Sequence, residues 1–265
     1  MKKFWFILTA LVATCFLVAC SGSQGVSPKT IKEKKKIVVA TESEFAPFEF
    51  KSLVNGKDTL VGADIELAKA IGEKLGVKVE FSVMSFDNVL ANVQSGKADI
   101  AIAGISVTDE RKKVYDFSDS YYTSENVVIV KKDKVNDYTS TDSLAKQTVG
   151  TQKGSVQETV AKKQISKASV VSLASNGEMI NELKSGQLQA VVLEKAIAEG
   201  YIAQSDDLTL ANFNLKSDGT DAYAVATRKG SDDLLKEINA VIKETKDSGK
   251  FDQWLKEAST YKQSK

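Results

Sequence analysis

The feature that most constrains the fold is a helix-and-strand pattern that the chain carries twice. Residues 89–96 fit a helix with a Ser-Gly stop, and a buried strand follows and ends near Gly104. Residues 179–186 fit a second helix with the same stop, and its strand ends at Glu194. Glycine after a helix is common, so the stop alone is a weak signal, but the whole pattern predicts two lobes that share one architecture.

Around this pattern, short apolar runs alternate with amphipathic helices. Residues 37–40 fit a buried strand, residues 63–75 a helix, and residues 77–83 a strand with one buried face. This succession predicts an α/β fold with a mostly parallel sheet. Ligands of open α/β sheets sit beyond the carboxyl ends of the strands, so two facing lobes would place their strand ends across one cleft. A long helix over 231–248 is expected to pack on the core.

The N-terminus has the pattern of an export signal. Lys2 and Lys3 precede an uncharged run to Ala19, which is shorter than the roughly 20 apolar residues of a membrane-spanning helix. Cys20 follows Leu-Val-Ala directly, and this order resembles the lipobox of bacterial lipoproteins, in which the cysteine is lipidated. The resemblance implies a signal peptide over 1–19 and a lipid anchor at Cys20 on the extracytoplasmic face of the cell membrane.

The segment after the predicted anchor is polar and then basic. Residues 21–28 are mostly small and polar, and residues 29–36 are rich in lysine. We expect residues 20–36 to form a lipidated, flexible tether. It is either a solvated leash, which is the favoured interpretation, or a segment that touches anionic lipid head groups.

Composition favours a binding protein over an enzyme. The chain has no histidine, which excludes histidine-based triads, histidine-ligated metals and the usual proton shuttle. We therefore expect neither a cofactor nor a metal. Its second cysteine, Cys15, would leave with the signal, so no internal disulfide is expected. Loss of the two N-terminal lysines turns the formal net charge of +1 into −1, so no basic surface indicates a nucleic-acid partner.

The sharpest motif is AGISVTDER, from Ala103 to Arg111. It follows a strand and opens a short helix, so Gly104 would let a ligand approach the backbone, and Ser106 or Thr108 would cap the helix. The free N–H groups at a helix start attract an anion, and Arg111 could hold a carboxylate through two parallel hydrogen bonds. The residues alone leave an ordinary capped helix with a surface arginine as an equal alternative.

A second motif, IVVATESEFAPFEF, places Glu42 just beyond a strand end, where a ligand group could meet it. Phe45 and Phe86 are aromatic residues in loops after strands. Such a pair can enclose a flat or cationic side chain. Taken alone, either phenylalanine is better explained by loop packing.

Four segments together follow the order and spacing of a known family. They are IVVATESEFAPFEF, VGADIELAKAIGEKLGV, SFDNVLANVQSGKADIAIAGISVTDERKKVYDFSDSYY and VGTQKGSVQE. From about Ile37 to its final helices, the chain resembles the polar amino-acid substrate-binding proteins of ABC importers. The resemblance implies a two-lobed, periplasmic-binding-protein-like fold of type II. Lobe 1 would comprise residues 37–122 and 225–265, and lobe 2 residues 123–224, with hinge crossovers near 120–125 and 220–224.

The resemblance also implies a role for each matching residue. Arg111 would clamp the α-carboxylate of the ligand together with Ser106 and nearby backbone N–H groups. Glu194 would take the α-ammonium, although relatives usually carry the shorter aspartate there. The aromatic rings of Phe45 and Phe86 would stack on the ligand side chain, and Ala103 and Gly104 would offer backbone carbonyls. Gln152 stands at a position where side-chain selectivity varies among relatives. Val156 stands where relatives often carry a small or hydroxyl residue.

The charges expected inside a closed cleft favour a cationic amino acid. Arg111 contributes one positive charge and Glu42 and Glu194 one negative charge each, so a cationic side chain would restore balance. A neutral ligand would leave a buried charge unpaired, at a cost of several kcal/mol. Arginine or lysine is expected, with histidine a further candidate. Glutamine stays the alternative, because relatives with an acid at position 42 also bind it. Glu44 is expected to face solvent.

The expected partners are a free amino acid, an ABC permease with its ATPase, and the membrane through Cys20, with the chain itself a monomer. Binding would shift the population toward a closed form that docks on the permease. Two other classes of function stay open. One is an extracytoplasmic dehydratase on the same fold, with Glu42 and Glu194 as its acid and base. The other is a surface adhesin.

Overall fold

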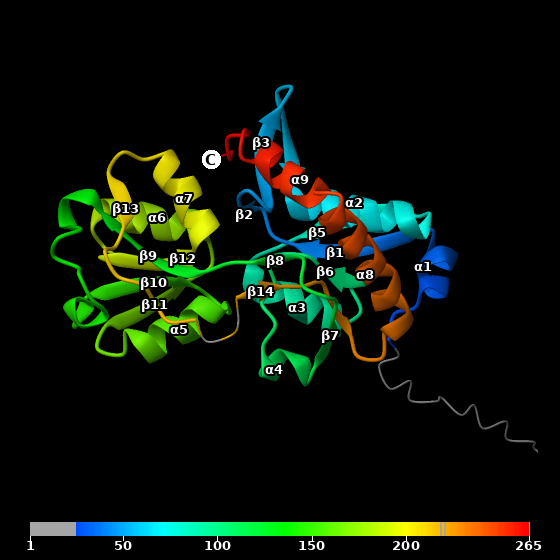
Figure 1. Cartoon of the computed structure of the whole chain (residues 1–265), viewed down its shortest axis with the longest axis horizontal. Coiled ribbons are helices and arrows are strands. Elements are labelled where there is room, and N and C mark those ends of the chain that lie inside the picture. Colours follow the sequence, from blue (N-terminus) through cyan, green and yellow to red (C-terminus); the bar gives the residue numbers. More distant parts are fainter. Residues whose placement is uncertain (1–24, 218, 220, 265) are drawn as a thin grey trace, which may run out of the picture.

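The chain forms two lobes that lie side by side, joined through the region of β8 and β14 (Figure 1). A computed structural model describes residues 25–217, 219 and 221–264. The predicted signal peptide and Cys20 lie outside the described residues, and so does Thr220 of the predicted second hinge. Among the described helices, none combines the length and the apolar character that crossing a membrane requires.

Lobe 1 is built on a five-stranded sheet of order β5-β1-β6-β15-β7, with β2, β3 and β4 in a separate antiparallel sheet. Its strands are β1 (Lys36–Thr41), β2 (Glu44–Phe45), β3 (Glu49–Val54), β4 (Lys57–Val61), β5 (Lys78–Val83), β6 (Ile100–Ala101), β7 (Tyr115–Phe117) and β15 (Ala226–Arg228). Its helices are α1 (Pro28–Lys34), α2 (Ala63–Leu75), α3 (Phe86–Gln94), α4 (Asp109–Lys112), α8 (Asp232–Asp247) and α9 (Lys250–Ala258).

Lobe 2 repeats this plan with a sheet of order β11-β10-β12-β9-β13. Its strands are β9 (Asn126–Lys131), β10 (Thr148–Gln152), β11 (Ser169–Leu173), β12 (Ala190–Glu194) and β13 (Leu208–Leu210). Its helices are α5 (Val156–Gln164), α6 (Asn176–Ser185) and α7 (Lys195–Ala203), with single 3₁₀ turns over Lys132–Lys134 and Thr141–Leu144.

Strand register confirms that the two lobes share one architecture. Val39 lies opposite Ile100 in lobe 1, and Val149 lies opposite Ala190 in lobe 2. Counting on along the second strand of each pair places Gly104 and Glu194 at equivalent positions, as the repeated pattern predicts. The two lobes therefore share the pairing of their strands as well as the order of their helices and strands.

Each five-stranded sheet is mostly parallel, as predicted, because four of its strands run in one direction and only one runs against them. β5, β1 and β6 are parallel, but β15 pairs antiparallel with both β6 and β7. In lobe 2, β9 likewise runs antiparallel to β12 and β13. β9 and β15 are the strands that follow the two crossovers between lobes. They enter their sheets from the end where the neighbouring parallel strands finish, so they must run against them.

The two crossovers lie against each other. β8 (Tyr122–Thr123) pairs antiparallel with β14 (Ala222–Tyr223), with Tyr122 opposite Tyr223. Both strands fall within the predicted hinge segments. Hinge motion about this ribbon and the exact lobe boundaries stay predictions.

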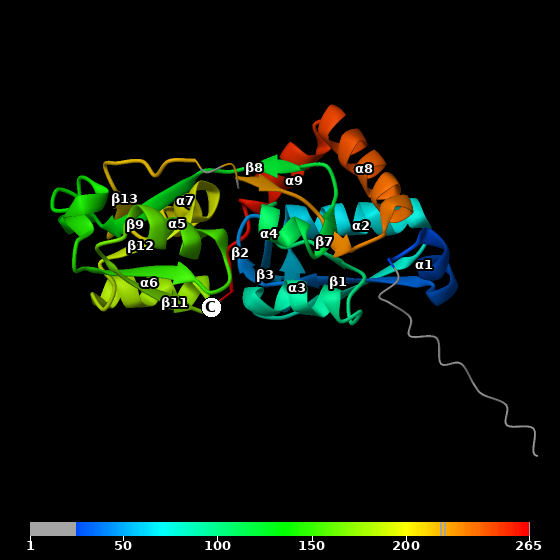
Figure 2. The ribbon, with the colours of Figure 1, turned by 90° about the horizontal axis from the view of Figure 1, so that it is seen from below.

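Alternating side chains give each face of the sheet of lobe 1 its own core. Val39 and Ile100 pack in the cluster that includes residues of α2, α8 and α9, whereas Ala40 and Ala101 pack with α3. Figure 2 shows α3 on one side of this sheet and α2 and α8 on the other. This layering leaves the carboxyl ends of β1, β5 and β6 to face the other lobe.

The predicted tether is wrong for the described residues 25–36. Helix α1 starts with Pro28 at its first position, and the side chains of Ser27 and Thr30 form a capping box. Ile31 is fully buried in the main core cluster, and Val26 is buried beside it. Two buried apolar residues, one just before this lysine-rich helix and one on its inner side, dock the segment on lobe 1.

Candidate functional site

The carboxyl ends of the two sheets meet at the seam between the lobes. Glu42 follows β1 of lobe 1, and Gln152 is the last residue of β10 in lobe 2. Gln152 Nε2 donates to Glu42 Oε2 over 3.1 Å, and each side chain is only 4 % exposed. The structure thus brings two predicted site residues, distant in the chain, into direct contact.

Arg111 spans the same seam. The hydroxyl of Thr108 caps α4 by accepting from the backbone N–H of Arg111 at 3.1 Å. The guanidinium donates through Nη1 to the carbonyl of Ser106 at 2.7 Å and through Nη2 to the carbonyl of Gly154 in lobe 2 at 3.1 Å. Its Cζ lies 5.9 Å from the ring centre of Phe86. Burial lowers the pKa of Arg111 to about 10, against the opposing attraction of acidic groups.

Glu194 lies at the end of β12, where α7 begins. The residue is 6 % exposed, and its Oε1 accepts from Gln157 Nε2 at 2.7 Å. Gln157 also donates to Asn126 Oδ1 at 2.7 Å, which ties Glu194 to the strand that follows the first crossover. Burial raises the pKa of Glu194 to about 7, although the hydrogen bond from Gln157 and the charge of Arg111 lower it. The charges of Arg111 and Glu194 therefore attract each other.

Glu42 is the more strongly perturbed of the two acids. Burial raises its pKa to about 8. The hydrogen bond from Gln152 opposes this rise, while the charges of Glu44 and Glu194 add to it. The seam therefore buries two carboxyl groups, of which Glu194 is attracted by the guanidinium of Arg111, and both acids retain protons that exposed carboxylates would release.

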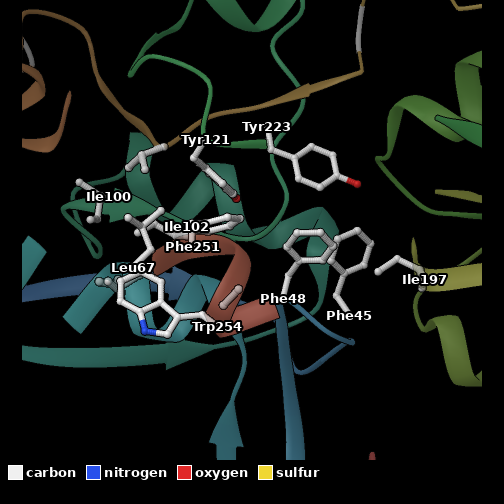
Figure 3. Close-up of a cluster of buried hydrophobic side chains, with 14 of the residues drawn as sticks. Phe45, Phe48, Leu67, Ile100, Ile102, Tyr121, Ile197, Tyr223, Phe251 and Trp254 are labelled. Atoms are coloured by element: carbon white, nitrogen blue, oxygen red, sulfur yellow. The ribbon is translucent and has the colours of Figure 1, made fainter. Parts of the chain in front are cut away.

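Phe45 and Gly104 pack tightly against each other on the lobe 1 side. Gly104 has a φ of +55°, and a Cβ atom there would lie 2.6 Å from Phe45 Cε1. The Phe45 ring also packs against Phe48 and Tyr223, with ring centres 5.6 and 6.2 Å apart. Figure 3 shows Ile197 of α7 pointing toward Phe45 from lobe 2. Glycine is therefore required for this close approach of the backbone to an aromatic ring.

The remaining predicted residues have separate surroundings. Phe86 opens α3 and packs in a different hydrophobic cluster from Phe45, and the enclosure of a ligand side chain by these two rings stays a prediction. Ala103 is buried, and Ser106 forms an isolated bridge with Tyr223. Val156 is the first residue of α5 and is 8 % exposed. It lines a groove of about 730 Å³ together with Arg111.

Three contacts at the seam were not predicted. Glu44 does not simply face solvent, because its Oε2 accepts from the Ser175 hydroxyl and from the Gly177 N–H, at 3.1 Å, where α6 begins in lobe 2. Lys153 forms an ion pair of 2.9 Å with Asp87 across the seam. The third contact is the hydrogen bond that Gln157 donates to the carboxylate of Glu194. The sequence marks Ser175 as a helix cap, but nothing local indicates a partner in the other lobe.

Comparison with known proteins agrees with this geometry. Residues 37–258 match the family of bacterial extracellular solute-binding proteins, family 3. The arginine-binding extracellular protein ArtP of Bacillus subtilis is 34 % identical over 261 residues, which cover 97 % of each chain. The glutamine-binding protein GlnH of Bacillus subtilis is 31 % identical over 277 residues, covering 97 % of this chain and 98 % of GlnH.

A solved structure gives the same result. The amino-acid ABC transporter substrate-binding protein AbpA of Streptococcus pneumoniae, bound to L-arginine, is 50 % identical with a TM-score of 0.85. The match covers 87 % of this chain and 97 % of AbpA. The predicted resemblance and the predicted two-lobed fold of type II are confirmed, and the chain belongs to the bacterial extracellular solute-binding proteins of family 3.

Proposed function

We propose that this chain captures a cationic amino acid, arginine foremost, by lobe closure and delivers it to an ABC permease. The observation that carries the proposal is the charge at the seam. Glu42 and Glu194 are buried there with pKa values raised to about 8 and about 7, and the charge of the Arg111 guanidinium acts on Glu194. A ligand with one surplus positive charge would balance both acids in their ionised forms, whereas with a neutral ligand one of them would have to keep its proton or stay buried as an uncompensated charge.

The ligand would be held at three points. Its α-carboxylate would bind the guanidinium of Arg111, on the lobe 1 side of the seam. Its α-ammonium would bind Glu194 of lobe 2, which Gln157 already orients. Its cationic side chain would extend toward Glu42. Because these groups belong to different lobes, only the closed form satisfies both ends of the ligand, and binding therefore favours closure.

The relatives support arginine more than glutamine. ArtP is named as an arginine-binding protein, and the structure of AbpA contains bound L-arginine. GlnH, in contrast, is named as a glutamine-binding protein. Glutamine is the second candidate, because Glu42 could accept from its side-chain amide. Glu42 already accepts a hydrogen bond from the side-chain amide of Gln152, which is the same contact that a glutamine ligand would make. This observation is the reason to keep glutamine as a candidate ligand.

Titration calorimetry with single amino acids tests the ligand, after unfolding and refolding has removed any ligand carried through purification. We expect binding of arginine and lysine. We also expect Glu42→Gln to weaken arginine binding by at least tenfold, from the loss of a charged hydrogen bond. Asp58→Asn, at an exposed ion pair with Lys51, is the matched control and should leave affinity unchanged. Tight glutamine binding without a response to arginine or lysine would contradict the assignment.

Attachment to the membrane belongs to the same proposal. The predicted signal peptide and lipidated Cys20 would hold the chain on the extracytoplasmic face of the cell membrane, next to its permease and ATPase. Cells fed a labelled fatty acid should label the wild-type chain, and Cys20→Ala should abolish labelling and release the protein into the medium. Equal labelling of both chains would contradict a lipid anchor at this residue.

We further propose that the chain binds without turning over its ligand. The competing dehydratase function would use Glu42 and Glu194 as acid and base, but the hydrogen bonds from Gln152 and Gln157 already engage both groups. Incubation with a cyclohexadienyl acid, followed by chromatography, should yield no dehydrated product. Catalytic formation of that product would contradict the binding role.

A further inference from the structure

Two acidic side chains are fully buried behind the loop that carries Gly104. Glu49 lies in β3 and Asp64 in the first turn of α2, and neither has exposed surface. The backbone N–H of Asp64 donates to the carbonyl of Phe48 at 2.9 Å, so the two residues are neighbours, and the charge of Asp64 raises the pKa of Glu49. Within the described residues, Glu49 Oε1, Glu49 Oε2 and Asp64 Oδ1 have no hydrogen-bond partner, and a bond between the two carboxyl groups would satisfy them. Two ionised carboxylates only accept hydrogen bonds, so a bond between them requires that one of the two carries a proton.

Hydrogen bonding decides which residue carries the proton. Asp64 Oδ2 accepts from the hydroxyl of Tyr121 at 2.7 Å and from the N–H of Gly104 at 3.1 Å. Asp64 also lies at the start of α2, where the helix dipole favours negative charge. Within the described part of the chain, neither oxygen of Glu49 has any donor of its own. The negative charge therefore belongs on Asp64 and the proton on Glu49.

The groups that Asp64 holds belong to the binding loop and to the first crossover. Gly104 is the left-handed residue packed against Phe45, and its predicted role is a ligand contact. Tyr121 immediately precedes β8, and its N–H donates to the carbonyl of Tyr223 in the second crossover at 3.0 Å. We propose that Glu49 and Asp64 share one proton, and that this pair positions the Gly104 loop and the crossovers for ligand binding.

Loss of the proton would disturb this arrangement. Two adjacent buried carboxylates repel each other, and Asp64 would have to turn away from Glu49. It could do so only by weakening its bonds to Gly104 and Tyr121. The loop has little room to adapt, because Gly104 already approaches the Phe45 ring closely. Affinity for the ligand should therefore fall when Glu49 ionises.

The surroundings of Glu49 hold the proton in place at neutral pH. Burial raises the pKa of Glu49 well above its ordinary value, and the charges of Asp64, Glu42 and Glu194 raise it further. The neighbouring hydroxyls of Tyr121 and Tyr223 also stay protonated, since burial raises the pKa of each. Burial raises the pKa of Asp64 to about 6, while the bonds from Tyr121 and Gly104 lower it, so Asp64 ionises first.

Infrared spectroscopy tests the proton without any ligand. The matched variant is Glu49→Gln, whose amide donates to Asp64 but does not titrate. At neutral pH the wild-type spectrum minus that of Glu49→Gln should contain a protonated-carboxyl stretch, and alkaline titration should remove it. The wild-type Gly104 amide resonance should shift over the same pH range. A difference spectrum without this band at neutral pH would overturn the proposal.

Affinity for arginine tests the positioning role, and this arm depends on the proposed function. Wild type and Glu49→Gln should bind alike at neutral pH. At alkaline pH the wild type should weaken relative to the variant by up to tenfold per pH unit, the limit for one linked proton. A ratio of affinities that stays constant with pH would overturn the positioning role. Should arginine fail to bind at all, the proposed function falls, while the infrared and Gly104 measurements still decide whether the proton is shared.

Discussion

Glu42 and Gln152 stand at equivalent positions of the two lobes and hydrogen-bond to each other across the seam. Each lies three positions beyond the residue, Val39 or Val149, that pairs with Ile100 or Ala190. The duplicated architecture thus brings matching strand ends face to face. One lobe presents a carboxyl group and the other an amide, so the two halves are alike in backbone and different in chemistry.

Arg111→Ala should abolish ligand binding without unfolding the protein. The cap of α4 uses the backbone N–H of Arg111, so it survives the substitution. Removing one partner of a buried charge pair costs about 3–5 kcal/mol, which corresponds to a loss of at least about a hundredfold in affinity. Calorimetry and thermal melting would check both statements. Arg111→Lys keeps the charge but loses the planar, two-pronged guanidinium, so its ligand affinity should lie between those of the wild type and the alanine variant. Undiminished affinity in the alanine variant would reject the carboxylate role.

The ligand-free protein should open as the pH rises. Burial at the seam raises the pKa of Glu42 to about 8 and of Glu194 to about 7 from an ordinary 4.5, and opening of the seam would return both groups toward water. The closed form thus binds more protons than a form with exposed carboxyls. The resulting stabilisation of the closed form relative to the open form is fully present below about pH 4.5 and is lost as the pH rises through 7 and 8. Small-angle scattering should give a larger radius of gyration at alkaline pH, and an unchanged radius would contradict this linkage.

Arginine binding should release protons at neutral pH. A cationic ligand stabilises the ionised forms of Glu42 and Glu194, so both lose the protons that burial retains. Affinity should accordingly rise from acid to neutral pH. Calorimetry at pH 7 in buffers of different ionisation enthalpy measures the number of protons, and Glu42→Gln should reduce it. Net proton uptake would mean that the ligand does not compensate these acids.

Glu44→Gln should weaken closure without changing which ligand is preferred. Its carboxylate accepts from two donors where α6 begins in the opposite lobe. A negative charge at a helix N-terminus contributes up to about 1 kcal/mol, so affinity should fall about fivefold. Glu178→Gln in the first turn of the same helix is the control, because Glu178 is exposed. Equal effects of the two substitutions would argue against a contact that acts through closure.

Ile31→Ala should destabilise lobe 1 while leaving ligand affinity unchanged. The side chain is fully buried in the main core cluster, and truncation of such a residue costs about 2–5 kcal/mol. Lys32→Ala, on the exposed side of α1, should have little effect. Urea unfolding followed by circular dichroism would compare them. Equal stability of the two variants would show that α1 does not dock in solution.

Local sequence patterns predict the long elements well and the short ones poorly. The helix expected over 63–75 is α2 with the same bounds, and that expected over 231–248 contains α8. β7 and β15 have three residues each, which is too few for a periodic pattern to appear. The antiparallel direction of β15 follows from the chain crossing between lobes, which no local window contains.

The same division holds at the site. AGISVTDER predicts a capped helix start with an arginine, because capping and the placement of Arg111 depend on neighbouring residues. The contacts of Glu44 with α6 and of Glu49 with Asp64 join segments that neither periodicity nor spacing relates. Glu44 in particular lies between polar and apolar neighbours, a pattern that fits an exposed position as well as a seam.

By itself the sequence determines the order of helices and strands, their duplication and the inventory of charges, since these depend on side-chain pattern and composition. Only the tertiary structure decides that Gln152 meets Glu42, that Gln157 orients Glu194, and that two acids are fully buried behind Gly104. The physical reason is that burial sets the pKa values and the partners of these groups. Burial arises only when segments far apart in the chain pack together, within a lobe for Glu49 and Asp64 and between the lobes for Glu42 and Gln152.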